Sequence, residues 1–447
     1  MRRTSTTRRN FLGLFGRLLA LVPAAGALPL LVSCGGGNGG GGTVTPPPST
    51  GYTGTDEQLM DEIERAAFQF FWEQANPQTG LIKDRANASG NDSYTVSSIA
   101  SVGFGLTALC IGASRGYMAT ATIRDRVLTT LNTLLNTAEG QQGFFYHFLD
   151  MESAQRAWSS ELSNIDTAIL LCGVLTARQH FAADARIPSV ATQIYERVNW
   201  QWMLDNATNT LWMSWTPESG FQNAHWDHYC ELMMMYLLGI GSPTYPLPAA
   251  SWSAWSRPNF TYNGITYISS GDPLFTHQYS HAWFDFRNKH DAFADYFQNS
   301  VRATQAHKQF CLALASQFPG YTDDLWGITA SDSAHGYVAW GGPPAVGPID
   351  GTVVPCAAGG SLPFLYTECM KVLRNIRSKY ASRAWGKYSF IDAFNPGSTW
   401  TNPDVIGIDV GITMLMIENY RTQFVWSTFM ANPEAQTAMQ LAGFAAG

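Results

Sequence analysis

SIASVGFGLTALCIGA, residues 98–113, is apolar on nearly every side and gives the strongest indication of fold class in the chain. A helix that lacks a polar face has to be buried all round. Three further segments share this character: residues 165–177 (IDTAILLCGVLTA), 232–240 (LMMMYLLGI) and 412–417 (ITMLMI). We therefore predict a set of inner helices that other parts of the chain enclose.

A second set of segments predicts helices with a single apolar face. The first starts at a capping box, residues 55–58 (TDEQ), and others lie near residues 122–138, 188–204 and 292–317. Because the two kinds of helix alternate along one chain, the sequence predicts an all-α toroid of two concentric helical layers. An irregular helical domain is the alternative. Residues 260–268 (FTYNGITYI) predict a short β-hairpin on a long insertion.

The composition narrows the classes of partner. Charged residues make up 14% of the chain and the formal net charge is -7, which argues against a nucleic-acid partner. The 15 Trp, 18 Tyr and 25 Phe residues would suit a groove that stacks on sugar rings, although a large aromatic core would also use them. No phosphate-binding glycine loop or GxSxG motif is present, and we expect no cofactor.

The first residues predict an export signal. TRRNFLG (residues 7–13) resembles a twin-arginine motif, and an apolar stretch over residues 11–32 follows it. A transmembrane helix is the alternative reading, but Pro23 and Pro29 interrupt the stretch. The stretch ends in LVSC, which resembles a lipobox, so we predict cleavage before Cys34 and lipidation of that residue.

These features divide the chain into three parts. Residues 1–34 form the predicted signal peptide, residues 35–53 a Gly/Pro-rich linker, and residues 54–447 one folded catalytic domain. We therefore expect a monomer that a lipid anchor holds to a membrane in the cell envelope, in the periplasm or at the outer membrane. Six cysteines follow the linker, and we predict buried thiols rather than a disulfide framework, with one bridge left open.

Four acidic residues stand at or before the starts of the predicted inner helices. They are Glu161, Asp166, Glu231 and Asp409. In a toroid the amino ends of the inner helices meet at one mouth, so these side chains could share a site. Helix capping is the alternative for each of them singly. Trp158, Trp226 and Trp400 lie near them in sequence and favour a shared site.

Glycoside hydrolysis requires a pair of carboxyl groups, and a mouth lined with acidic residues would supply such a pair. One group protonates the leaving oxygen, while the other activates water or attacks carbon. A difference in burial would keep the first protonated and the second ionised. The sequence alone chooses neither inversion nor retention.

A second polar cluster, residues 277–287 (HQYSHAWFDFR), alternates hydrogen-bonding groups with aromatic rings, as recognition of sugar hydroxyls requires. His277 and His281 could instead bind a metal together with His225 and His228, but no HExxH motif accompanies them. We therefore predict no metal.

A polysaccharide lyase is a third reading of this cluster. Tyr279 or His281 would serve as the base, and Arg287 would neutralise a uronate. The acidic net charge argues against an anionic substrate.

Several ordered motifs together resemble the bacterial glycoamylase-like domain family over residues 55–430. They are Thr79-Gly80-Leu81, Glu161-Leu162-Ser163-Asn164-Ile165-Asp166-Thr167, Pro273-Leu274-Phe275, His277-Gln278-Tyr279, Trp283-Phe284-Asp285-Phe286-Arg287, Trp326-Gly327, Ala330-Ser331-Asp332, Asp350-Gly351-Thr352 and Ile417-Glu418-Asn419-Tyr420-Arg421. The resemblance implies an (α/α)6 barrel with long loops, and kinship with endo-β-1,2-glucanases and the glycoamylase-like domain of cyclic β-1,2-glucan synthases.

The resemblance also implies an inverting mechanism and site residues. Glu231, in Tyr229-Cys230-Glu231, is similar to the family's acid, and Asp409, in Gly407-Ile408-Asp409, to its base. The implied substrate-binding residues are Trp158, Glu161, Asp166, Trp226, His277, Gln278, His281, Trp283, Asp285, Arg287, Trp326 and Asp332. The implied substrate is a neutral glucan, an oligo- or polysaccharide, most simply β-1,2-glucan.

One departure leaves the glucan linkage open. In the β-1,2-glucanase branch of the family that the chain resembles, an Asp-x-x-Glu pattern follows the position of Trp158. This chain has Ser163 and Asp166 there instead. A β-1,3-glucan, another β-glucoside and an α-glucan remain alternatives. A surface glycan-binding lipoprotein without catalysis is the competing function, and it would not need both Glu231 and Asp409.

Overall fold

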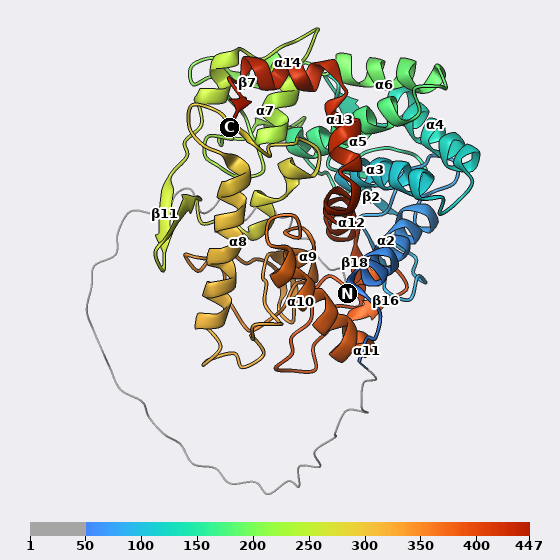
Figure 1. The fold of residues 1–447 in the computed structure, drawn as a ribbon. Helices are drawn as coiled ribbons and strands as arrows, with labels where there is room; N and C mark the ends of the chain where they lie inside the picture. Colours follow the sequence, from blue (N-terminus) through green and yellow to red (C-terminus); the bar gives the residue numbers. More distant parts are fainter. Residues whose placement is uncertain (1–50) are drawn as a thin grey trace, which may run out of the picture.

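The computed structural model describes residues 51–447, so the predicted signal peptide, Cys34 and most of the predicted linker lie outside the described residues. Helices make up most of the regular structure (Figure 1). They are α2 (Asp56–Glu73), α3 (Ile99–Arg115), α4 (Thr120–Asn136), α5 (Asn164–His180), α6 (Arg186–Glu196), α7 (Met233–Ile240), α8 (Tyr296–Ala313), α9 (Pro355–Gly359), α10 (Tyr366–Lys379), α11 (Ala381–Ala384), α12 (Gly407–Thr422), α13 (Phe424–Met430) and α14 (Pro433–Leu441). Four 3-10 helices accompany them: η1 (Trp200–Trp202), η2 (Ala249–Ser253), η3 (Leu274–His277) and η4 (Tyr279–Ala282).

The four predicted inner helices are α3, α5, α7 and α12, and the structure buries them along almost their whole length. α3 and α5 approach closely where two glycines meet. A Cβ atom on Gly173 would lie 2.1 Å from the carbonyl oxygen of Gly103. Only residues without a side chain permit this approach. The prediction that these apolar segments are buried helices is confirmed.

α12 is longer than the predicted segment 412–417 at both ends. The extra turns contain polar residues that are nevertheless buried, such as Glu418 and Asn419. Each has a partner from another segment: Arg115 lies 2.7 Å from Glu418, and the Asn419 side chain donates to the carbonyl oxygen of Ala282. Apolar periodicity could not predict these turns, because partners from distant segments compensate their burial.

The one-sided helices α2, α4 and α6 cover the inner set: α2 packs on α3 and α12, α4 on α3, and α6 on α5. The capping box of α2 forms as predicted between Thr55 and Gln58. The predicted helix 188–204 is wrong at its end, because α6 stops at Glu196. Asn199 then accepts a hydrogen bond from Trp202 N and so caps η1, a role that asparagine favours.

Short strand pairs lie at the amino ends of the inner helices. β2 (Val96–Ser98) leads into α3 and pairs with β5 (Phe148–Asp150). β6 (Leu162–Ser163) leads into α5 and pairs with β9 (Ser214–Thr216), and β18 (Asp404–Ile406) leads into α12 and pairs with β1 (Arg85–Asn87). The bridges Lys83–Ser97 and Tyr146–Leu162 join these pairs to one another. We call this set of strand pairs and helix starts the amino rim.

The predicted hairpin on the insertion is confirmed. β11 (Asn259–Tyr262) pairs with β12 (Ile265–Ile268) and lies beside α8 (Figure 1). Asn263 and Gly264 both have positive φ, which suits a two-residue hairpin turn.

The all-α prediction missed the other strands, which are too short to show an alternating pattern. These are β3 (Gly140–Gln141), β4 (Phe144–Phe145), β7 (Leu204–Asp205), β8 (Thr210–Leu211), β10 (Gly220–Phe221), β13 (Lys289–His290), β14 (Ala330–Ser333), β15 (Gly336–Ala339), β16 (Trp385–Gly386), β17 (Ser389–Phe390) and β19 (Ala445–Ala446).

Two further observations concern the described residues as a set. Their six cysteines are buried and free, as predicted. Within residues 51–447, every helix is too short or too polar to cross a membrane.

Candidate active site

The structure places the four candidate carboxylates at or near the starts of the inner helices α5, α7 and α12. Asp166 and Asp409 lie in the first turns of α5 and α12, and Glu161 directly precedes β6. Glu231 lies two residues before α7. The segment that carries it is tied to the start of α5, because the Trp226 indole donates a hydrogen bond of 2.9 Å to the Asn164 side chain.

Helix capping does not account for Glu231 or Asp409. The N-cap residues of α7 and α12 are Leu232 and Ile406, and neither helix has a side-chain hydrogen bond at its cap. At α5 the capping side chain is Ser163, which accepts from the Asp166 backbone N–H. The three helix starts therefore place buried or half-buried carboxylates that local helix geometry does not require.

Asp409 belongs to a cluster of three aspartates. It is 5% exposed, and Asp392, which is 1% exposed, shares a hydrogen bond with it. The Asp332 backbone N–H donates to Asp392 Oδ2 at 2.9 Å. Asn402 donates to the same oxygen at 2.7 Å and to Asp332 at 3.1 Å. Burial, followed by the charges of Asp409 and Asp332, raises the pKa of Asp392 well above its usual value.

Arg85 faces this cluster from β1. Its guanidinium lies 2.7 Å from Asp332 and 3.1 Å from Asp84. Although burial disfavours the charge of Arg85, the two carboxylates raise its pKa above the usual value. Tyr94 interacts with the same guanidinium, and burial raises the pKa of the Tyr94 hydroxyl.

A row of aromatic rings leads from Tyr94 along the rim. The ring centroids of Tyr94 and Trp158 are 6.1 Å apart, and those of Trp158 and Phe148 are 5.1 Å apart. Trp158 is 53% exposed and has positive φ, so its loop presents an indole face to solvent. That Trp158 stacks on a sugar ring stays a prediction.

His147 ends the row and joins two of the predicted carboxylates. Its ring stacks on Phe148 at 3.9 Å, Nδ1 lies 3.0 Å from Glu161, and Nε2 lies 3.6 Å from Asp166. All three polar side chains are half-buried. A histidine inside an aromatic run (FFYHFLD) was the signal that could have identified it in the sequence.

Glu231 has an environment of its own. It is 6% exposed, and the charges of Glu231 and Asp272 both act on Cys230 and on His228. Burial raises the pKa of Asp272 to about 6, and the charge of His228 opposes this rise. Ser280 holds the start of α7 in place, because it donates to the Glu231 carbonyl oxygen and accepts from Met234 N. Sequence analysis did not identify Asp272.

Six side chains that we expected to line the cleft are buried in the protein interior instead. They are Trp226, His277, Gln278, His281, Trp283 and Trp326. Several of their polar atoms bond within the protein: Gln278 donates to the carbonyl oxygen of Ala357, and Trp283 donates to Thr107. Burial lowers the pKa of His277 and of His281 to about 3. The residue types alone could not show which polar and aromatic side chains would be exposed and which would be buried.

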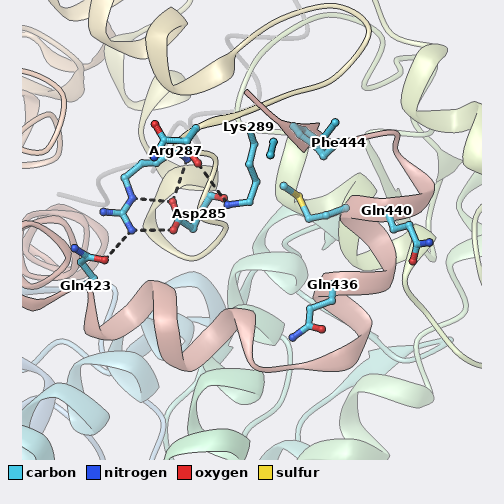
Figure 2. Close-up of a pocket in the computed structure, with 11 residues that line it drawn as sticks. Asp285, Arg287, Lys289, Gln423, Gln436, Gln440 and Phe444 are labelled. Carbon is cyan, nitrogen blue, oxygen red and sulfur yellow. Dashed lines mark hydrogen bonds and ion pairs between the residues drawn. The ribbon is translucent and has the colours of Figure 1, made fainter.

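Asp285 and Arg287 lie at the other end of the molecule from Asp409. Figure 2 shows Arg287 bonded to Asp285 and to Gln423, the residue that follows α12, and the Arg287–Asp285 side-chain contacts are 2.8 Å long. At 1.5 Å per residue, α12 separates Gln423 from Asp409 by about 21 Å. The pair lines a separate pocket of about 700 Å³ with Gln436 and Phe444, so the expectation that it lies beside the candidate carboxylates is wrong.

A family model matches the part of the chain that carries Glu231 and Asp409. Its description is "Glycoamylase: Putative glucoamylase", and the match covers residues 223–433. Asp272, Asp332 and Asp392 fall inside the same range, whereas Glu161 and Asp166 precede it.

A curated relative comes from Parabacteroides distasonis and is named "Exo beta-1,2-glucooligosaccharide sophorohydrolase (non-reducing end)". It is 30% identical over 432 residues, which cover 88% of this chain and 58% of that protein. The present chain therefore spans little more than half the length of this relative.

Two solved structures are similar over nearly their whole length. The endo-β-1,2-glucanase of Chitinophaga pinensis, in complex with sophorotriose and glucose, has a TM-score of 0.81 and 28% identity, covering 88% of this chain and 99% of that one. A "putative glucoamylase" of Bacteroides uniformis has a TM-score of 0.83 and 27% identity, with the same coverage.

Proposed function

Because the chain belongs to the glycoamylase-like family, we propose that it is a glycoside hydrolase that cleaves a neutral β-glucan, with β-1,2-linked glucose chains as the substrate. The observation that carries the proposal is the position of Glu231, Asp409, Glu161 and Asp166 at the starts of inner helices, where capping does not account for the first two. The names of the Parabacteroides and Chitinophaga relatives support the β-1,2 linkage despite the departure at Ser163 and Asp166.

The proposed scaffold is an (α/α)6 barrel. Four buried helices with covering helices between them in sequence support this arrangement, as does the similarity to the Chitinophaga glucanase. In such a barrel the amino rim is the mouth, which places the substrate across the starts of α5, α7 and α12.

The proposed mechanism is inverting. The Glu231 carboxyl group gives its proton to the glycosidic oxygen as the bond from that oxygen to the anomeric carbon breaks. Asp409 takes a proton from a water molecule, whose oxygen attacks the same carbon from the opposite face. The products are a sugar with inverted anomeric configuration and a free hydroxyl on the leaving chain.

Other rim residues are proposed to hold the glucan. Trp158 offers an exposed ring face, and the Glu161–His147–Asp166 group offers acceptors and a donor for hydroxyl groups. Asp332 and Arg85 would contact the sugar next to Asp409.

The cellular setting is also a proposal. The twin-arginine motif and the lipobox-like LVSC support export of a monomer and its anchoring to the cell envelope through Cys34. The linker would then separate the domain from the membrane surface.

An incubation with defined glucans tests the proposed activity. The full chain, Glu231→Gln and Asp409→Asn are each given linear β-1,2-, β-1,3-, mixed-linkage β- and α-1,4-glucans, and product anomers are followed by NMR. We expect wild type to cut the β-1,2-glucan and release the inverted anomer, with both variants inactive. Product length distinguishes endo from exo action. Equal glucan binding by all three proteins without cleavage would establish the glycan-binding lipoprotein instead.

A further inference from the structure

Asp392, in the loop after β17, is buried and forms hydrogen bonds with several other residues. Its side chain is 1% exposed. Its backbone N–H donates to the carbonyl oxygen of Asp404, at the start of the strand that leads into α12. Its Oδ2 accepts from Asp332 N at 2.9 Å and from Asn402 at 2.7 Å. Two segments, residues 402–404 and the strand that carries Asp332, thus fix both the position and the rotation of this carboxyl group.

The other oxygen of Asp392 has an unusual environment. Oδ1 is fully buried, and no donor group among residues 51–447 reaches it. The side chain that shares a hydrogen bond with Asp392 is Asp409. Two carboxylates can form a hydrogen bond only if one of them carries a proton, because ionised carboxylates only accept. A buried polar oxygen left without any partner would also be costly.

The surrounding charges indicate which carboxyl group keeps the proton. Asp392 faces Asp409 from α12, Asp332 from β14 and Arg85 from β1. Arg85 forms its ion pairs with Asp332 and Asp84, and Tyr94 interacts with both Arg85 and Asp404. Asp392 is therefore the more buried group, with two negative neighbours and no direct cation, a setting that raises a carboxyl pKa.

We propose that Asp392 is a positioning residue, which remains protonated and donates a hydrogen bond to Asp409. The inference rests on the proposed function, in which Asp409 activates water. The donated bond fixes the plane of the Asp409 carboxylate, and the pair carries a single negative charge that resides on Asp409. The group that takes the proton from water is thus ionised and oriented before the substrate binds.

Asp392→Asn tests this proposal, because an asparagine amide imitates the protonated acid. Its oxygen can accept from Asp332 N and Asn402, and its NH₂ can donate to Asp409. We expect Asp392→Asn to keep activity and to shift the acid limb of the kcat/KM–pH profile by less than about half a unit. If the charge resided on Asp392, its removal would lower the pKa of Asp409, and the acid limb would move down by about one unit or more. That result would overturn the proposal.

Two further variants separate positioning from a structural role. Asp392→Leu keeps the branched shape of the side chain but removes the donor, and we expect kcat to fall about 100-fold, the scale of a misplaced catalytic group, with KM little changed. Unchanged kcat in Asp392→Leu would contradict the proposal. Asp291→Asn is the matched control, since Asp291 is buried and binds Trp252 and Tyr296 away from the rim. Its acid limb should coincide with that of wild type.

A substrate-independent measurement keeps the test valid if no glucan is cut. A carboxyl group whose pKa is raised by folding stabilises the protein below its unfolded pKa, and this stabilisation is lost as pH rises through the folded pKa. Asparagine has no proton to lose. The Tm of Asp392→Asn should therefore increase relative to wild type as pH is raised from 5 to 8. A constant or decreasing difference would show that Asp392 is not protonated, whereas absent cleavage by wild type would count only against the proposed function.

Discussion

Glu64 shows, at the scale of single residues, that a second buried carboxyl group has a raised pKa. It is completely buried on α2, and burial followed by the charge of Glu418 raises its pKa well above the usual value. Arg421 and Arg115 oppose this rise. Because the folded pKa is raised, the stabilisation that Glu64 contributes is present at low pH and is lost as pH increases through that pKa.

Glu64→Gln should therefore become more stable relative to wild type as pH rises. Glutamine keeps an oxygen that can accept from Arg421 and from Tyr117, which lies 3.2 Å from Glu64. Thermal unfolding at several pH values between 5 and 8 measures the difference in Tm. A difference that shrinks with pH would mean that Glu64 is ionised in the folded protein.

His147 makes a prediction for the amino rim. Its ring joins Glu161 and Asp166, so its removal should leave two half-buried carboxylates to repel each other. We expect His147→Ala to raise the KM for a β-1,2-gluco-oligosaccharide about tenfold, on the scale of a lost charge-assisted hydrogen bond. Steady-state kinetics separates this from an effect on kcat, and a change in kcat alone would place His147 in the chemical step.

Glycines set the separation of elements in the interior. Gly173 on α5 meets the backbone of Gly103 on α3, and backbone atoms cannot move aside as the end of a side chain can. A Cβ on Gly105 of α3 would instead meet the tips of Ile82 and Phe71. The same substitution should therefore have different consequences at the two positions.

Gly173→Ala should destabilise the protein by about 1–3 kcal/mol, the usual cost of overpacking. Gly105→Ala is the matched control and should cost less, because flexible side chains can give way and alanine favours the helix by about 1 kcal/mol. Urea unfolding of both variants gives the comparison. Equal costs would indicate that α3 and α5 can shift apart.

The described chain begins at the end of the molecule opposite to Asp409. Glu57, in the first turn of α2, pairs with Arg421 near the end of α12, whereas Phe70 of α2 packs near Gly407, where α12 begins. α2 and α12 are therefore antiparallel. If the proposed lipid anchor holds residue 51 toward a membrane, the amino rim faces away from it.

This orientation predicts that anchoring leaves the site accessible. The measured quantity is the cleavage rate on a long β-1,2-glucan divided by the rate on a short oligosaccharide. This ratio should be the same for the full chain in lipid vesicles and for the chain without residues 1–34 in solution. A selective loss of activity on the long polymer in vesicles would mean that the rim faces the membrane.

The sequence by itself determined the buried helices and several residues of the candidate site. Segments such as 98–113 have no polar face, so burial on every side is their only stable solution. Acidic residues at helix starts pointed to the rim, because the amino ends of inner helices meet in a toroid. Trp158 was predicted and is exposed there. These inferences depend on patterns of neighbouring residues, which are present in the sequence whether or not the chain is folded.

The tertiary structure alone decided which polar residues face one another. Asp392 and His147 stand in apolar or aromatic runs that predict core, and Asp272 stands in a turn-like Ser-Ser-Gly-Asp-Pro segment. Only the packing of distant segments places them beside Asp409, Glu161 and Glu231. The same packing places Asp285 and Arg287 at the far end of α12. Burial, charge and shared protons depend on distances between segments remote in sequence, and spacing along the chain does not contain those distances.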